Sequence, residues 1–138
     1  MNDKIENLGL NAETDSAGFE SFHRGDPADP RSIDVALTHG IDLTDHTARM
    51  FSVMDFDRFD RIYVMDRNNY EDVMGLARSP QDKQKVDFIL NLLSPRENRQ
   101  VPDPWYGGKG QFEKTFLMLE QACDRLAQEL LYIERSAR

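Results

Sequence analysis

The sequence of 138 residues predicts a parallel α/β sheet covered by helices on both faces. Strand-like and helix-like segments alternate along the chain, as they do when crossover helices join parallel strands. The clearest strand is 61–65, which is β-branched and aromatic at its centre. The clearest helix is the last one, where apolar residues recur at alternating spacings of four and three: Phe112, Phe116, Leu119, Cys123, Leu126, Leu130 and Ile133.

The N-terminal third of the chain predicts a helix, a short strand and a loop. Residues 4–10 have the pattern of the end of a helix, with Gly9 near its last turn. Residues 13–18 (ETDSAG) predict a short strand that runs into a loop. The segment 19–30 is rich in Gly, Pro and Asp, so we expect it to be irregular.

The next segment carries clear signals for the start and the end of a helix. Asp29 suits the cap, Pro30 suits the first turn, and Gly40 suits the position just past the end. The i, i+3, i+4 spacing predicts an inner face made of Ile33, Ala36 and Leu37.

The middle of the chain predicts short helices around two buried strands. Ser52 and Asp55 form a variant capping box that opens a short helix through Phe59. Asn68 or Asn69 can cap a further helix, whose predicted face is Tyr70, Val73, Met74 and Ala77. After a loop at Ser79 and Pro80, residues 85–93 predict a buried strand, with a short helix as the alternative. The acidic run of Asp55, Asp57 and Asp60 predicts a solvated face.

Composition limits the classes of partner. With 39% apolar and 30% charged residues, the chain is expected to form one soluble domain over residues 1–138. A net charge of −8 argues against nucleic acid and against an anionic membrane as partners. No run of about 18 apolar residues and no signal-peptide pattern occurs, and the single cysteine, Cys123, fits a reducing compartment, so we expect a cytoplasmic protein.

The segment 94–110 is a long loop that is rich in proline and glycine. Loops of this length are usually functional or disordered. This one carries Trp105 and Tyr106 directly after Pro-Asp-Pro, which is unusual for a linker.

Seven segments, in family order, make the chain resemble the low-molecular-weight protein tyrosine phosphatases. They are DSAG at 15–18, DPR at 29–31, HGI at 39–41, H-x-A-R at 46–49, DFDRFD at 55–60, MD at 65–66 and VPDPWYGG at 101–108. The resemblance implies a three-layer α/β sandwich with a four-stranded parallel sheet in the order 2-1-3-4. It also implies hydrolysis of a phosphotyrosine protein or a small aryl phosphate through a cysteinyl-phosphate intermediate, without a cofactor.

The resemblance assigns roles to particular residues. Asp103 matches the general acid, and Trp105 and Tyr106 match the aromatic pair that follows it. Phe22 matches an aromatic position on the other side of the substrate cleft. Ser16 and His46 match positions that support the phosphate loop, whereas Arg49, Met65 and Asp66 match positions that we interpret as structural.

Each of these assignments has a simpler alternative. Asp103 could form only the Asx-turn that is common before proline. The aromatic side chains of Trp105, Tyr106 and Phe22 could fold onto the core. His46, with Asp42 and Asp45 nearby, fits no standard set of metal ligands, so we expect no metal site.

The nucleophile loop of the family, C-x5-R-[ST], does not occur in the sequence. The residue six places after Cys123 is Glu129, and Cys123 lies on the apolar stripe of the last helix, so we interpret it as a core cysteine. Aligned on DSAG, Met1 falls inside the first helix of the family. We therefore expect that the first strand and the nucleophile loop are absent from this chain, through a misassigned start or a fragment, and that the chain is inactive.

The strand expected to be absent is an interior one, so its loss would leave unpaired edges. We therefore expect instability, a homodimer or exchange of elements with a partner. Two other functions stay open: a catalytically dead relative that binds a partner through the aromatic cleft, and an arsenate reductase on the same fold. The latter requires additional cysteines in relatives, and Cys123 is the only one here.

Overall fold

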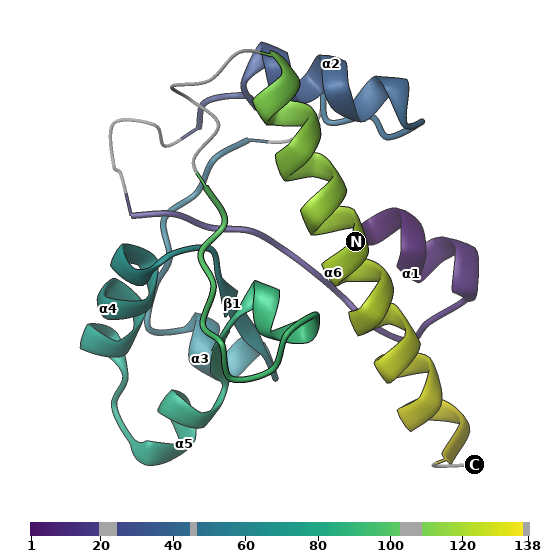
Figure 1. Cartoon of the computed structure of the whole chain (residues 1–138). Helices are drawn as coiled ribbons and strands as arrows, with labels where there is room; N and C mark the ends of the chain where they lie inside the picture. The colour runs from purple at the N-terminus through teal and green to yellow at the C-terminus, as the bar shows by residue number, and fades with distance from the viewer. Residues whose placement is uncertain (20–24, 45–46, 103–108, 137–138) are drawn as a thin grey trace.

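The computed structural model describes residues 1–19, 25–44, 47–102 and 109–136, with the backbone alone at Lys109. Figure 1 shows how its helices and strands are arranged. In chain order they are α1 (Asn2–Leu8), α2 (Pro30–Thr38), α3 (Asp55–Arg58), β1 (Ile62–Val64), α4 (Arg67–Leu76), α5 (Pro80–Gln84), β2 (Val86–Phe88), the 3-10 helix η2 (Ile89–Leu92) and α6 (Lys109–Ser136).

The sheet is a short parallel ladder with helices on both faces. β1 and β2 pair in parallel through Ile62 with Val86, Tyr63 with Asp87, and Val64 with Phe88. Successive side chains of a strand point to opposite faces. The predicted α/β class, with parallel strands between layers of helices, is therefore confirmed.

One face of the sheet packs against α3 and α4. Val64 and Phe88 meet Phe56 of α3 and Val73 of α4 in one hydrophobic cluster, and the Tyr70 ring stacks on Phe88. In Figure 1, α3, α4 and α5 gather on this side of β1.

The other face packs against η2 and α6. A second cluster joins Ile89 and Leu90 of η2 to Val101 and to Ala122 of α6, and Tyr63 packs against it. The residues 85–93 therefore form both predicted alternatives in succession, a strand and then a 3-10 helix.

The strand predicted over residues 13–18 is not formed. Within the described residues the sheet has only β1 and β2, so the four-stranded order is not seen. Residues 13–17 make no backbone hydrogen bond to another described segment, and only Gly18 forms an isolated parallel bridge, to Met50. A strand needs a neighbouring strand to satisfy its backbone groups, and none of the described segments lies in ladder register with this one.

Helix α2 is capped as predicted, but its buried face differs. The Asp29 side chain accepts a hydrogen bond from the backbone of Arg31, and Pro30 opens the helix. Val35 and Ala36 are buried, whereas Leu37 is 51% exposed and was wrongly placed on the inner face. The face that packs on α6 includes Arg31, which lies over the Phe112 ring, so Leu37 points away from it.

Two predicted boundaries in the middle of the chain need correction. Asp66 caps α4 through a 2.8 Å hydrogen bond from the backbone of Asn69, so neither Asn68 nor Asn69 is the cap. Asp66 can do this because it still has the extended backbone that follows β1. The loop predicted at Ser79 and Pro80 instead begins α5, with Ser79 as its cap.

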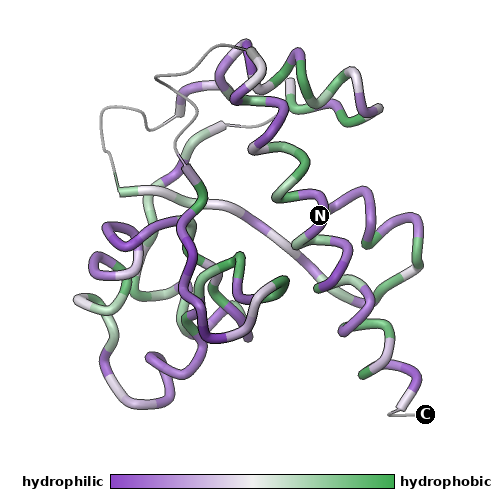
Figure 2. Tube along the Cα trace, in the orientation of Figure 1, coloured by the Kyte–Doolittle hydropathy of each residue, from purple (hydrophilic) through white to green (hydrophobic). Residues whose placement is uncertain are grey.

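The last predicted helix is confirmed as α6, which has 28 residues. Hydrophobic and hydrophilic stretches alternate along it in Figure 2. Phe112, Ala122 and Ala127 are buried, whereas Ile133 is 50% exposed because the end of α6 extends past the sheet. None of the described helices combines the length and the apolar composition needed to span a lipid bilayer.

Candidate functional site

Most of the predicted site residues fall outside the described part of the chain: Phe22, His46, Asp103, Trp105 and Tyr106. Ser16 is described, and it is exposed in the extended segment 13–17. The structure shows where the described segments next to the five undescribed site residues lie.

The segment that leads to Asp103 is held at the carboxyl end of β1. The backbone N–H of Val101 donates to the carbonyl of Met65 at 2.8 Å, and Val101 is buried. The neighbouring N–H of Arg67 donates to Gln100 Oε1 at 2.9 Å. In open α/β sheets, ligands bind in the crevice outside the carboxyl ends of the strands. The loop after Pro102 therefore starts from the edge where such a fold binds its ligands.

The segment 48–51 holds the chain on both sides of residues 20–24. Before them, Gly18 N–H donates to the Arg49 carbonyl at 2.9 Å and Phe51 N–H donates to the Gly18 carbonyl at 2.8 Å. After them, Gly25 N–H donates to the Ala48 carbonyl at 2.7 Å. The segments that flank Phe22 and His46 are thus parts of one hydrogen-bonded unit.

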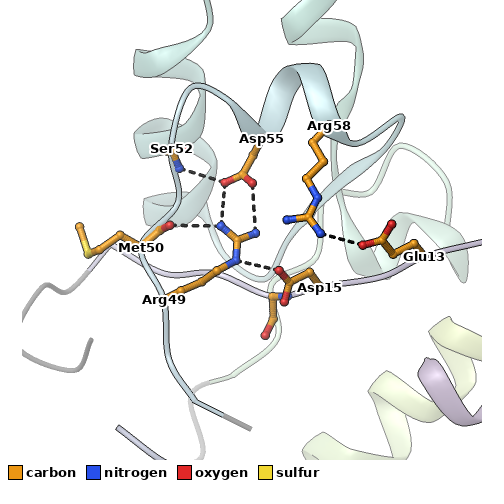
Figure 3. Close-up of polar contacts among 8 residues, drawn as sticks. Glu13, Asp15, Arg49, Met50, Ser52, Asp55 and Arg58 are labelled. Carbon is orange, nitrogen blue, oxygen red and sulfur yellow. Dashed lines mark hydrogen bonds and ion pairs between the residues drawn. The ribbon is translucent and has the colours of Figure 1, made fainter. Parts of the chain in front are cut away.

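The Arg49 side chain connects this unit to α3 (Figure 3). Its two terminal nitrogens donate to the two carboxylate oxygens of Asp55, each at 3.1 Å, and its Nε donates to Asp15 Oδ2 at 2.9 Å. Arg49 Nη1 also donates to the Met50 carbonyl at 3.2 Å. Asp55 is only 5% exposed, whereas the Arg49 side chain is 34% exposed, so the carboxylate end of this pair is the buried one.

The charges of this network shift pKa values in the expected directions. The hydrogen bond to Asp55 raises the pKa of Arg49, against the opposing effect of burial. Partial burial acts to raise the pKa of Asp15. The Ser16 N–H bond and the Arg49 charge outweigh that effect and hold the pKa of Asp15 below its usual range.

The comparisons with known proteins decide the family. A family model described as low molecular weight phosphotyrosine protein phosphatase matches residues 1–135. The chain belongs to this family.

Relatives and solved structures agree over most of the chain. A Synechocystis protein assigned to the same phosphatase family is 37% identical over 132 residues, which cover 94% of this chain and 83% of that one. The low molecular weight protein-tyrosine-phosphatase of Streptomyces coelicolor is 37% identical over 89% of this chain and 77% of its own. A protein tyrosine phosphatase of Entamoeba histolytica, solved with Hepes in its active site, superposes with a TM-score of 0.85 and 33% identity, covering 96% of this chain and 85% of that one.

For a member of this family, the position of Cys123 matters because the sequence holds one cysteine. Cys123 is half-buried in the middle of α6. Burial raises the pKa of its thiol, although the positive charges of Lys4 and of the chain's own amino group act in the opposite direction. A reactive cysteine has the reverse property, a thiolate stabilised by nearby donors and cations.

No group of three or more metal-ligating side chains occurs among the residues that the structure describes. Asp42, which lies four residues before His46, accepts hydrogen bonds from the backbone N–H and the hydroxyl of Thr44, at 2.9 and 2.6 Å. This is the geometry of an Asx-turn. Asp45 and His46 lie outside the described residues.

Sequence reasoning missed the network around Arg49. The expected solvated face is wrong for Asp55, which is buried and paired. Asp57 and Asp60 are exposed as predicted, and Asp57 also pairs with Arg78 at 2.7 Å. The capping pattern was the available signal. Ser52 N–H donates to Asp55 Oδ2 at 2.9 Å, so Asp55 turns back toward the chain that contains Arg49.

Proposed function

We propose that the chain carries the general-acid part of a phosphotyrosine phosphatase site, with Asp103 as the acid. The supporting observation is the 2.8 Å hydrogen bond from Val101 to Met65, because it starts the Asp103 loop from the carboxyl edge of the sheet. Membership in the phosphatase family supports the same role.

In this proposal, Asp103 protonates the phenolate oxygen as its bond to phosphorus breaks, and later accepts a proton from the attacking water. A general acid within hydrogen-bond reach typically contributes about 10²–10⁴ in rate. Trp105, Tyr106 and Phe22 would form flat walls that stack on the phenyl ring of phosphotyrosine. Ser16 and His46 would support the phosphate loop by hydrogen bonds.

The nucleophile is a separate part of the proposal. Cys123 does not suit the role, because burial raises the pKa of its thiol and it lies within α6. We therefore propose that residues 1–138 alone do not hydrolyse aryl phosphates. Activity would require the C-x5-R-[ST] loop to be present ahead of the DSAG segment.

A chimaera tests both parts. The 138-residue chain is assayed beside a version that carries, ahead of Met1, a strand and a C-x5-R-[ST] loop of the kind that the family resemblance implies. We expect no hydrolysis of p-nitrophenyl phosphate above buffer for the first and measurable hydrolysis for the second. If the chain alone is active and its activity survives Cys123→Ser, the proposal that residues 1–138 lack the nucleophile is contradicted. A folded but inactive chimaera would favour a catalytically dead binding protein, and arsenate reduction by it would favour the third function.

The role of Asp103 is tested in the same chimaera. Asp103→Asn should lower kcat by about 10²–10⁴. The loss should be larger for phenyl phosphate than for p-nitrophenyl phosphate, because the more basic phenolate depends more on the proton. Glu97→Gln, an exposed acid on the same connecting segment, is the matched control and should leave kcat unchanged. A loss below tenfold for Asp103→Asn rules out the acid role.

A further inference from the structure

We propose that Arg49 is a positioning residue of this site, which joins the buried Asp55 to Asp15 and thereby fixes Ser16 and both ends of the segment that contains Phe22. The inference rests on the proposed phosphatase function for its catalytic meaning. Its geometric part concerns described residues only and can be tested without catalysis.

Asp55 is the fixed end of the connection. Its side chain is 7% exposed, and its carboxylate accepts hydrogen bonds from both terminal nitrogens of Arg49 and, at 2.9 Å, from the backbone N–H of Ser52. A two-pronged arginine–carboxylate pair sets the orientation of the guanidinium as well as its distance. The plane of the Arg49 side chain is therefore determined by α3.

Asp15 connects the oriented Arg49 guanidinium to the backbone of Ser16. One carboxylate oxygen of Asp15 accepts from Arg49 Nε at 2.9 Å, and the other accepts from the backbone N–H of Ser16 at 2.8 Å. Each oxygen of Asp15 thus has its own partner (Figure 3 shows the side chain between Arg49 and the extended segment). The backbone N–H of Ser16 is thus connected to Asp55 through three successive charge-assisted contacts, at Asp15, between Asp15 and Arg49, and between Arg49 and Asp55.

The backbone of the same arginine holds the next part of the chain. The Arg49 carbonyl accepts from Gly18 N–H, and the adjacent Ala48 carbonyl accepts from Gly25 N–H. Ala48 N–H in turn donates to the Asp26 carbonyl at 2.8 Å. The described residues on both sides of 20–24 are therefore attached to the segment that Arg49 anchors to α3.

A neighbouring ion pair provides the comparison for an ordinary surface contact. Arg58 donates to Glu13 at 2.7 Å, only two residues before Asp15 on the same extended segment (Figure 3). The side chains of this pair are 56% and 73% exposed, against 34% and 37% for Arg49 and Asp15. The Arg58 charge also helps to lower the pKa of Asp15, so the control substitution is made at Glu13 and leaves Arg58 in place. Exposed pairs of this kind contribute little to stability.

Matched substitutions distinguish the effect of the Arg49–Asp15 pair from that of the Arg58–Glu13 pair. Asp15→Asn and Glu13→Gln each replace an acid by its amide, and Arg49→Lys keeps the charge of Arg49 but loses the two-pronged contact. The measurement is amide hydrogen exchange, read by NMR, in the 138-residue chain. Asp15→Asn and Arg49→Lys should speed exchange of the Gly18 and Phe51 amides by about fivefold. Glu13→Gln should change both by less than twofold.

The outcomes distinguish positioning from general stabilisation. Faster exchange confined to the segments around Gly18 and Phe51, with α6 amides unchanged, supports the proposal. A uniform increase over all described elements, or equal effects of Asp15→Asn and Glu13→Gln, overturns it.

In the chimaera, Asp15→Asn should lower kcat/KM for p-nitrophenyl phosphate by about fivefold, and Glu13→Gln should not. An unchanged kcat/KM in an active chimaera overturns the proposal that the Arg49–Asp15 contact positions the site for catalysis. An inactive parent chimaera, combined with the local exchange effect, would count against the proposed function while leaving the geometric role of Arg49 supported.

Discussion

Val101 and Met65 join two connecting segments that lie 36 positions apart, through the 2.8 Å hydrogen bond between the amide of one and the carbonyl of the other. The Val101 side chain also belongs to the cluster of Leu90 and Ala122. One residue therefore anchors the start of the Asp103 loop by its backbone and by its side chain. This double attachment makes the loop's starting point part of the core.

Val101→Ala should lower the free energy of unfolding by about 1.5–3 kcal/mol, because it removes two buried methyl groups. Urea denaturation followed by far-UV circular dichroism measures the change. Leu117→Ala, at a position that is 43% exposed on α6, is the control and should cost less than half as much. Equal costs at the two positions would contradict the anchoring role of Val101.

Lys85→Met should destabilise the chain by about 1–2 kcal/mol, since it removes a charged donor from the end of α3. Lys85 Nζ donates to the carbonyls of Phe56 and Phe59 at 2.5 and 3.2 Å, and methionine keeps the apolar stem without the donor. Lys83→Met, on an exposed residue of α5, is the matched control. The same denaturation experiment should show a change for Lys83→Met within about 0.5 kcal/mol.

Acid should unfold the chain below about pH 4. Hydrogen bonds from Arg78 lower the pKa values of both Asp57 and Asp82. A carboxylate with a lowered pKa in the folded state stabilises the fold above its unfolded pKa, and this stabilisation is lost as pH falls through the folded pKa.

Asp82→Asn should therefore reduce the proton uptake on unfolding at low pH by up to about one proton. The slope of unfolding free energy against pH between about pH 2 and pH 5 gives this quantity. Asp60→Asn, at an exposed position, serves as the control. An identical slope for wild type and Asp82→Asn would show that the Arg78 contacts do not persist in solution.

Cys123 should react slowly with thiol reagents in the folded chain. Because burial raises the pKa of its thiol, we expect reaction with a disulfide reagent at pH 7.5 to be at least about tenfold slower than in urea. The rate of absorbance change after mixing measures this ratio. Similar rates in the folded and unfolded chain would mean that folding does not protect the α6 thiol, which would contradict its burial.

The sequence predicted those parts of the fold that depend on local signals. Helix α2 was placed by Asp29, Pro30 and Gly40, and α6 by its apolar stripe, because capping and periodicity are properties of neighbouring residues. The segment 13–18 was misjudged because a strand exists only with a partner, and partner pairing is not visible in local sequence.

For the candidate site, too, roles carried by local motifs could be predicted, whereas contacts between distant residues could not. Motif resemblance could assign roles to Asp103 and Ser16, whereas the contact between Asp15 and Arg49 joins residues 34 positions apart. No periodicity relates two such residues, and a charged residue near another is usually solvated. Only the folded arrangement reveals that Asp55 is buried and that Arg49 connects it to the extended segment.

The two hydrophobic clusters lie on opposite faces of a ladder of three residue pairs. Among the described residues, α6 packs on η2, which directly follows β2, so the α3–α4 side is connected to α6 through β2 and η2. Cooperativity of unfolding therefore depends on a very short stretch of backbone. We expect local unfolding of α4 to require less free energy than local unfolding of α6. Amide hydrogen exchange would then place α4 and α6 in different cooperative units of one domain.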